Sequence, residues 1–288
     1  MNYSNSKVIN FRKINNLPLI KYILSTFYKF RKIKNIQKYK TSEMSSGLII
    51  EFMGPSGIGK TTLFNEIWRY HKKKWFSKND IVLLKEKNDI DPFSIFDDFN
   101  STLYEKLLWK KFFLTFQGDR LLKTKVSLYE FYRKQIEIDI FVSHYKLPKG
   151  LLSDDGICGN FLEEVIYILL KTKENDALLY EIKKFFSNRS IVYFHANPSI
   201  IIDHLKQRSI DKPNSNNDYY SFYGPDIDSF VQNMIDKFEI LINLLEDMNI
   251  PIIKIDMKNE SRVEQVQKVN SFINNQIRLN QNYHNRKI

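Results

Sequence analysis

The chain has 288 residues with an ordinary globular composition, 43% hydrophobic and 27% charged, and its single cysteine excludes a disulfide framework or a cysteine-based zinc site within one chain. No apolar stretch approaches the roughly 18 uncharged residues of a membrane-spanning helix, so we expect a cytoplasmic protein. Of the net charge of +11, +9 belongs to the first 45 residues, where ten lysines and arginines accompany one acidic residue, so the rest of the chain has no basic excess that would indicate a nucleic-acid partner.

Residues 1–46 form a basic amphipathic appendage, in which residues 17–40 interleave bulky apolar side chains with lysines and arginines. This pattern suits a helix that lies on an anionic membrane surface, here the inner one. Two alternatives stay open, namely a helix docked on the chain's own domain and a disordered tail. An α/β domain is expected at residues 47–278, followed by a polar C-terminal tail at residues 279–288.

Short apolar runs alternate with amphipathic stretches along the main domain. We predict strands at residues 48–53, 81–85, 150–153, 190–195 and 251–255. Helices are predicted at residues 62–70, 160–170, 227–248 and 263–277, with another that opens at Pro198, an aromatic-rich helical region at 94–142 and a polar loop at 209–221. Strands that alternate with helices predict an α/β fold with a doubly wound five-stranded parallel sheet.

A glycine-rich segment directly follows the first predicted strand and matches the pattern G-x-x-x-x-G-K-[ST] in full. Its glycines let successive backbone N–H groups point at phosphate oxygens, and the following helix adds its positive end. Lys60 is expected to reach the β- and γ-phosphates, and the Thr61 hydroxyl to hold Mg²⁺. The sequence therefore predicts that ATP with Mg²⁺ binds at Gly54, Pro55, Ser56, Gly57, Ile58, Gly59, Lys60, Thr61 and Thr62.

Further segments, in chain order, resemble those of the P-loop nucleoside and nucleotide kinases, thymidylate kinase most of all. They are residues 81–86, 116–120, 151–155, 190–194 with Pro198 and Arg208, and 251–256. The resemblance covers about residues 47–278. It implies a P-loop kinase fold, in which the loop at 209–221 is a lid and residues 257–259 lie near the adenine. It also implies transfer of the γ-phosphate of ATP to a hydroxyl or phosphate of a small molecule.

The resemblance also assigns roles to single residues. Glu86, at the end of the second predicted strand, would accept or orient the proton of an attacking hydroxyl, and Lys87 stands where the family usually has proline. Arg120 would grip the acceptor. Arg208 would clamp the transferring phosphoryl group, helped by Lys212 in the lid. The implied catalytic residues are Lys60, Glu86, Asp154 and Arg208.

Two carboxylates end the third predicted strand. Asp154 aligns with the acid of the family, and Asp155 stands where the family has an arginine. Asp154 would support Mg²⁺ together with Thr61, because oxygen ligands suit that ion. Asp155 would lie in the acceptor site, and which of the two carboxylates faces the metal stays open. The missing arginine argues against a nucleoside monophosphate as acceptor.

The acceptor itself is left open as a nucleoside, a nucleotide, a sugar or a glycan-linked group, which could be membrane-associated. A second class of function is a P-loop ATPase or GTPase that acts as a regulatory or partner-driven switch without transferring the phosphate. A sulfotransferase-like protein would not need the Lys60–Thr61 pair, so that pair argues against it. Whether the chain forms a homodimer is also left open.

Overall fold

The computed structural model describes residues 47–87, 102–117, 121–144, 147, 149–171, 176–211 and 218–285. The predicted appendage at residues 1–46, Arg120, and residues 212–217 of the predicted lid lie outside the described residues. Among the described residues, none of the helices is both long enough and apolar enough to cross a bilayer.

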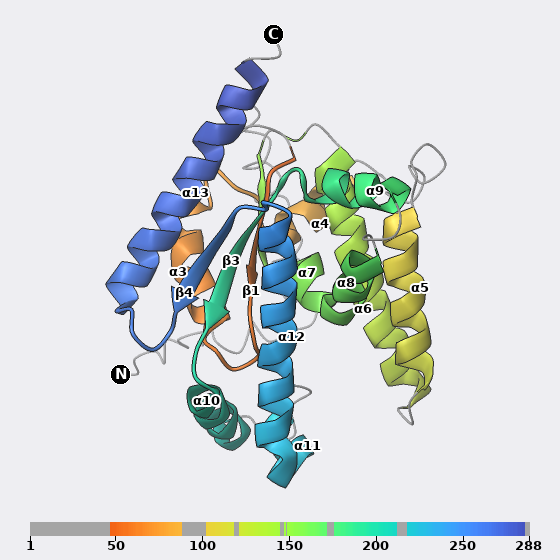
Figure 1. The fold of residues 1–288 in the computed structure, drawn as a ribbon, viewed down its shortest axis with the longest axis vertical. Helices are drawn as coiled ribbons and strands as arrows, with labels where there is room; N and C mark the ends of the chain where they lie inside the picture. The colour runs from red at the N-terminus through yellow and green to blue at the C-terminus, as the bar shows by residue number, and fades with distance from the viewer. Residues whose placement is uncertain are drawn as a thin grey trace, which may run out of the picture. The chain divides into compact units, whose positions relative to one another are not determined.

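A four-stranded sheet forms the centre of the described domain, in the order β2-β1-β3-β4, and all its strands are parallel (Figure 1). The strands are β1 (Ile49–Met53), β2 (Leu151–Asp154), β3 (Arg189–His195) and β4 (Ile252–Asp256). The predicted α/β class and four of the five predicted strands are confirmed. Because the strands are parallel, their carboxyl ends meet at one edge, where ligands bind in folds of this kind.

The strand predicted at residues 81–85 is wrong, because these residues belong to the helix α4 (Lys78–Lys87). Ser77 and Asp80 begin this helix as a capping box: the Asp80 carboxylate accepts the Ser77 N–H at 2.9 Å, and the Ser77 hydroxyl accepts the Asp80 N–H at 3.3 Å. Beside β2 there is instead a single parallel bridge between Phe76 and Leu151. A fifth strand is therefore absent from the described residues.

Helices cover both faces of the sheet, which confirms the doubly wound arrangement. Ile50 and Phe52 of β1 pack into one buried cluster with α3 (Lys60–His71), α10 (Pro198–Asp211) and α13 (Arg262–Asn285). Met53 packs into a second cluster, which includes side chains of five further helices. These are α5 (Thr102–Gln117), α6 (Leu122–His144), α7 (Ile157–Asn160), α8 (Leu162–Lys171) and α9 (Asp176–Phe186). The long helix α12 (Ile227–Asp247) contributes to both clusters.

The predicted helices are present, with different ends. The last of them continues to Asn285, through most of the predicted C-terminal tail. The predicted lid loop is shorter than expected, because α10 runs to Asp211 and the short helix α11 (Tyr219–Tyr223) begins before the loop was expected to end. A 3-10 turn at Gly224–Asp226 joins α11 to α12.

Candidate functional site

The glycine-rich loop lies between β1 and α3, in the strand–loop–helix context that the motif requires. Three of its glycines have positive φ angles: Gly54 at 150°, Gly57 at 87° and Gly59 at 94°. At Gly54 a Cβ would lie 2.6 Å from the Phe194 carbonyl oxygen, so the backbones of the loop and β3 approach too closely for any side chain. Glycine is therefore needed at these positions for the loop to curl, and a curl of this kind lets backbone N–H groups point at an anion.

Lys60 is the first residue of α3, and its side chain is buried against the loop. Its ammonium donates to the Gly54 carbonyl at 3.0 Å and lies 3.2 Å from the Asp155 carboxylate. An anion therefore already stands beside the lysine that is expected to hold phosphate. That anion is the partly exposed Asp155 side chain, which the sequence placed in the acceptor site.

Asp154 and Thr61, the two predicted metal ligands, are brought together. Asp154 ends β2 opposite Phe52 of β1, and Thr61 lies close enough to its carboxylate to lower the pKa of that group. Burial and the neighbouring Asp155 raise the pKa of Asp154, against the lowering influence of Lys60, Thr61 and Lys78. The arrangement favours a cation at this point, since a cation would compensate a charge that burial disfavours.

These residues fit Mg²⁺. The Asp154 Oδ1 atom is buried and has no hydrogen-bond partner, so one carboxylate oxygen is available to a ligand. In the described part of the chain no cluster of three or more His, Cys, Asp or Glu side chains could hold a metal by itself. Mg²⁺ does not need such a cluster, because it is commonly held by one or two carboxylates, water and the phosphates of a nucleotide.

The backbone of Asp155 is held in a conformation that is uncommon for a non-glycine residue, with φ at 52°. Its N–H donates to the Phe52 carbonyl at 3.1 Å, and its own carbonyl accepts from the Lys78 ammonium at 2.6 Å and from the Asn160 side chain. Burial lowers the pKa of Lys78, against the raising influence of Asp155 and Glu51. Lys78 was not predicted as a site residue, because no helix was expected to begin there.

A buried ionic network lies against the loop that follows β2. Arg189 of β3 pairs with Glu51 of β1 and with Asp139 of α6, the latter at 2.8 Å. Tyr104 donates to Asp139 at 2.6 Å, and the Cys158 N–H donates to Glu51 at 2.9 Å. Burial alone would lower the pKa of Arg189, but the two carboxylates raise it above its usual range. The network ties the sheet to the loop after β2, which carries Asp155.

Helix α10 lies over the glycine-rich loop and carries Arg208. The His204 Nδ1–H donates to the Gly57 carbonyl at 2.7 Å, and a Cβ at Gly57 would lie 2.9 Å from Leu205. Arg208 is half-buried and follows His204 by four residues, so the two share one face of the helix. This places Arg208 on the side of α10 that faces the loop. The contact of His204 had no signal in the sequence.

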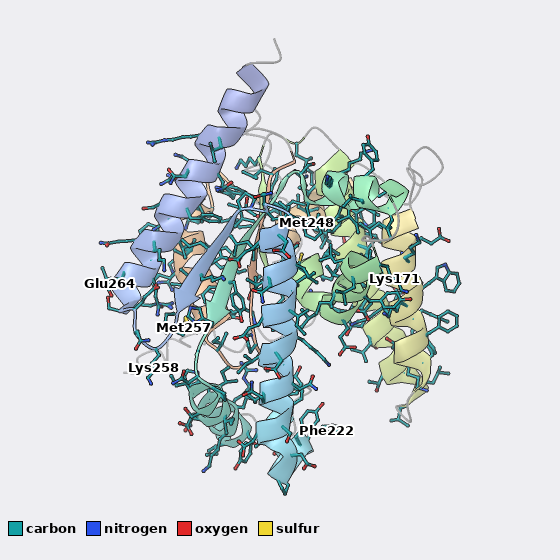
Figure 2. The ribbon with its side chains drawn as sticks, viewed as in Figure 1. Lys171, Phe222, Met248, Met257, Lys258 and Glu264 are labelled. Atoms are coloured by element: carbon teal, nitrogen blue, oxygen red, sulfur yellow. The ribbon has the colours of Figure 1, made fainter. Side chains whose placement is uncertain are left out.

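The two remaining predicted positions have opposite outcomes. Glu86 is exposed on α4, eight residues after Lys78 and therefore about 12 Å further along the helix. It does not end a strand, so the expected role of Glu86 as acceptor base is not supported. The segment after β4 does reach the loop, because a Cβ at Gly59 would lie 3.2 Å from the Met257 methyl group (Figure 2).

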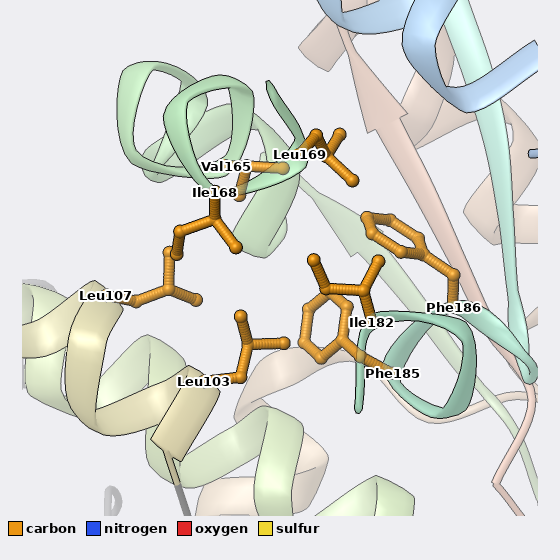
Figure 3. Close-up of a pocket in the computed structure, with 8 residues that line it drawn as sticks. All are labelled: Leu103, Leu107, Val165, Ile168, Leu169, Ile182, Phe185 and Phe186. Carbon is orange, nitrogen blue, oxygen red and sulfur yellow. The ribbon is translucent and has the colours of Figure 1, made fainter. Parts of the chain in front are cut away.

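A pocket elsewhere in the domain is apolar and unrelated to this site (Figure 3). Side chains of α5, α8 and α9 line it: Leu103, Leu107, Val165, Ile168, Leu169, Ile182, Phe185 and Phe186. It has no polar lining group that could hold a phosphate or a metal. We attribute it to imperfect packing between these helices.

We expect Asp154→Asn to raise the Mg²⁺ concentration needed for half-maximal activity by about 10–100-fold, as is typical when a group that supports a metal site is lost. The reason is that the amide removes the charge beside Thr61. A magnesium titration of ADP release in the presence of ATP measures it. Asp247→Asn, an exposed acid at the end of α12, is the matched control. An unchanged magnesium requirement in Asp154→Asn would remove Asp154 from the metal site.

We expect Arg208→Ala to lower the turnover number more than it raises the Michaelis constant, because a clamp on the phosphoryl group tightens only as charge develops. Steady-state kinetics in ATP, beside the exposed neighbour Lys206→Ala, provide the comparison. Normal turnover in Arg208→Ala would show that α10 contributes no such contact.

No protein-family model matches the chain, and no curated protein matches it either.

Proposed function

We propose that the chain is an ATP-dependent phosphotransferase, a kinase of the P-loop class that moves the γ-phosphate of ATP to a small-molecule acceptor. The supporting observation is the convergence of Lys60, Thr61 and Asp154 beside the glycine-rich loop, with Lys60 and Thr61 both close enough to the Asp154 carboxylate to lower its pKa. A lysine for phosphate oxygens, a hydroxyl and a carboxylate for Mg²⁺, and inward N–H groups are the parts that this chemistry requires. Bound Mg²⁺ would neutralise charge on the β- and γ-phosphates.

In this proposal Asp155 takes the role of proton acceptor that the resemblance implied for Glu86. Nucleotide phosphates compete with Asp155 for Lys60, so binding of ATP releases the Asp155 carboxylate from its ion pair. The free carboxylate then receives the proton of the acceptor hydroxyl as that oxygen bonds to the γ-phosphorus. The bond between the γ-phosphorus and the β–γ bridging oxygen breaks, and ADP leaves.

The same residue favours a neutral hydroxyl acceptor. A carboxylate where related kinases have an arginine would repel the phosphate of a nucleoside monophosphate. Nucleosides, sugars and glycan-linked sugars have the required hydroxyl without that charge. A screen of nucleosides, nucleotides and sugars for acceptor-stimulated release of ADP tests the proposal. Stimulation by nucleoside monophosphates alone would contradict the hydroxyl assignment.

We expect Asp155→Asn to separate binding from chemistry. ATP no longer has to displace Asp155 from Lys60, so ATP binding should tighten by about two- to fivefold. That factor corresponds to the free energy of a partly exposed ion pair, which is up to about 1 kcal/mol. Turnover should fall by about 10²-fold. This is at the lower end of the effects of removing a general base, because phosphoryl transfer depends little on such a base. Asparagine also tolerates a positive φ, so the loop is retained. Weaker ATP binding with normal turnover would contradict both roles.

A second candidate is an ATPase switch, and the ion pair between Lys60 and Asp155 favours it. Displacement of Asp155 by nucleotide would alter the loop after β2, which is the kind of change that a switch uses. The same screen distinguishes the two, since a switch would release ADP at a rate that no small acceptor increases.

A further inference from the structure

An aromatic surface on the hairpin of α5 and α6 lies outside the proposed catalytic site. Trp109 and Phe113 are 54% and 57% exposed and stack on each other with ring centroids 6.1 Å apart. The centroid of the Phe112 ring lies 5.8 Å from that of Phe113 and 5.3 Å from that of Tyr129 of α6. The aromatic surface therefore continues from one helix to the other. Figure 1 shows the two helices side by side at one edge of the domain.

Exposed aliphatic side chains of α6 extend this surface. Leu122 and Val126 are 68% and 46% exposed. With Tyr129 they have the spacing i, i+4 and i+7, which places them on one face of the helix. We call the set the hairpin patch, and it comprises Trp109, Phe112, Phe113, Leu122, Val126 and Tyr129. An apolar surface of this kind is unusual on a protein that has no partner.

Lysines border the hairpin patch. Of the described residues between 105 and 130, five are lysines and two, Glu105 and Glu130, are acidic. Lys106 and Lys123 are exposed. Lys110 lies over the Tyr167 ring at 3.5 Å, and Lys125 donates to the Phe116 carbonyl at 2.9 Å, so both are fixed close to the patch. The fifth, Lys111, is paired with the buried Glu164.

We propose that the hairpin patch binds an anionic membrane surface, with its aromatic rings at the level of the headgroups and its lysines on the lipid phosphates. Trp and other aromatic side chains favour that level of a bilayer, and anionic headgroups complement the lysines. A second copy of the chain would bring the same lysines together. Residues 1–46 are also a poor occupant of the hairpin patch. Their charge of +9 up to residue 45 would be repelled by the lysines that border it.

Tryptophan fluorescence gives a test specific to this surface. The chain has three tryptophans, Trp68, Trp75 and Trp109, and residues 1–46 contain none, so the appendage cannot produce the signal. Trp75 is buried and Trp68 is half-buried, which leaves Trp109 as the exposed reporter. Full-length protein is mixed with vesicles of phosphatidylglycerol and phosphatidylcholine that carry brominated acyl chains.

We expect the vesicles to quench the emission of the wild-type chain, and Trp109→Phe to lose that quenching. Phe113→Ser keeps the reporter, and should lower the partition coefficient about tenfold, as expected when one ring no longer leaves water. Phe131→Ser is the matched control, because Phe131 is 44% exposed on α6 but lies outside the patch. It follows Leu122 by nine residues, which is two and a half turns, and so lies on the opposite face of that helix. Vesicles of phosphatidylcholine alone should bind much more weakly.

Three results would overturn the proposal. Protein that binds the vesicles without quenching of Trp109 would show that another segment, such as the appendage, makes the contact. Equal binding to neutral and anionic vesicles would remove the role of the lysines. A dimer in sedimentation velocity that Phe113→Ser dissociates would make the hairpin patch a protein interface instead.

Discussion

Lys60→Ala should lower the turnover of ATP by about 10²–10³, the usual effect of removing one donor that stabilises charge in a transition state. The Lys60 ammonium lies against the Gly54 carbonyl at 3.0 Å, at the start of α3, so it is held at the mouth of the loop without further ordering. Loss of the ammonium also leaves Asp155 without its partner. We therefore expect weaker binding of ATP together with the lower turnover.

The control for this experiment is Lys72→Ala, an exposed lysine that follows the other end of the same helix. Nucleotide binding by calorimetry and release of ADP by a coupled assay would be measured for both variants. Normal binding and turnover in Lys60→Ala would contradict the assignment of the glycine-rich loop as a nucleotide site.

Arg189→Gln should lower the free energy of unfolding by about 3–5 kcal/mol, because it leaves two buried carboxylates without a cation. Glu51 and Asp139 are almost fully buried, at 0% and 3% exposure, so solvent cannot replace the guanidinium. This is a large fraction of the roughly 5–15 kcal/mol that stabilises a typical domain. Urea unfolding followed by circular dichroism measures it, with the exposed Arg69→Gln as control.

A neutral triple variant tests the cause of that loss. Glu51→Gln with Asp139→Asn and Arg189→Gln removes every charge from the network while it keeps the shapes of the side chains. If uncompensated charge is the cause, the triple variant should be more stable than Arg189→Gln alone. A triple variant that is less stable than the single one would show that hydrogen-bond geometry matters more than charge.

The strands around the candidate site could be predicted because each is a buried apolar run next to a turn or an acid. The error at residues 81–85 has a physical reason. A run of four apolar residues cannot be assigned to helix or strand by periodicity alone. The capping box formed by Ser77 and Asp80 was the signal that distinguishes them, and it was visible in the sequence.

The place of the glycine-rich loop after β1 and of Asp154 at the end of β2 could be predicted because each follows directly from a buried apolar run. The partners of Asp155 and Glu51 could not. Glu51 and Arg189 are 138 positions apart, and only the register of the sheet brings them together. Glu51 appeared as an interruption in an apolar strand, and a buried acid of this kind implies an unseen cation. The pairing of Asp155 with Lys60 joins two loops that are distant in the sequence, and Asp155 has a positive φ, which is uncommon outside glycine and leaves no local pattern.

Transfer of labelled phosphate tests the central proposal most directly. The protein would be incubated with Mg²⁺, ATP labelled in its γ-phosphate group, and a mixture of nucleosides and sugars. The products would then be separated by chromatography and identified by mass spectrometry. We predict that the label appears in a phosphorylated small molecule, in an amount that matches the ADP released, and that Lys60→Ala abolishes the product. Label found only in inorganic phosphate, at a rate that no acceptor changes, would contradict the assignment as a kinase.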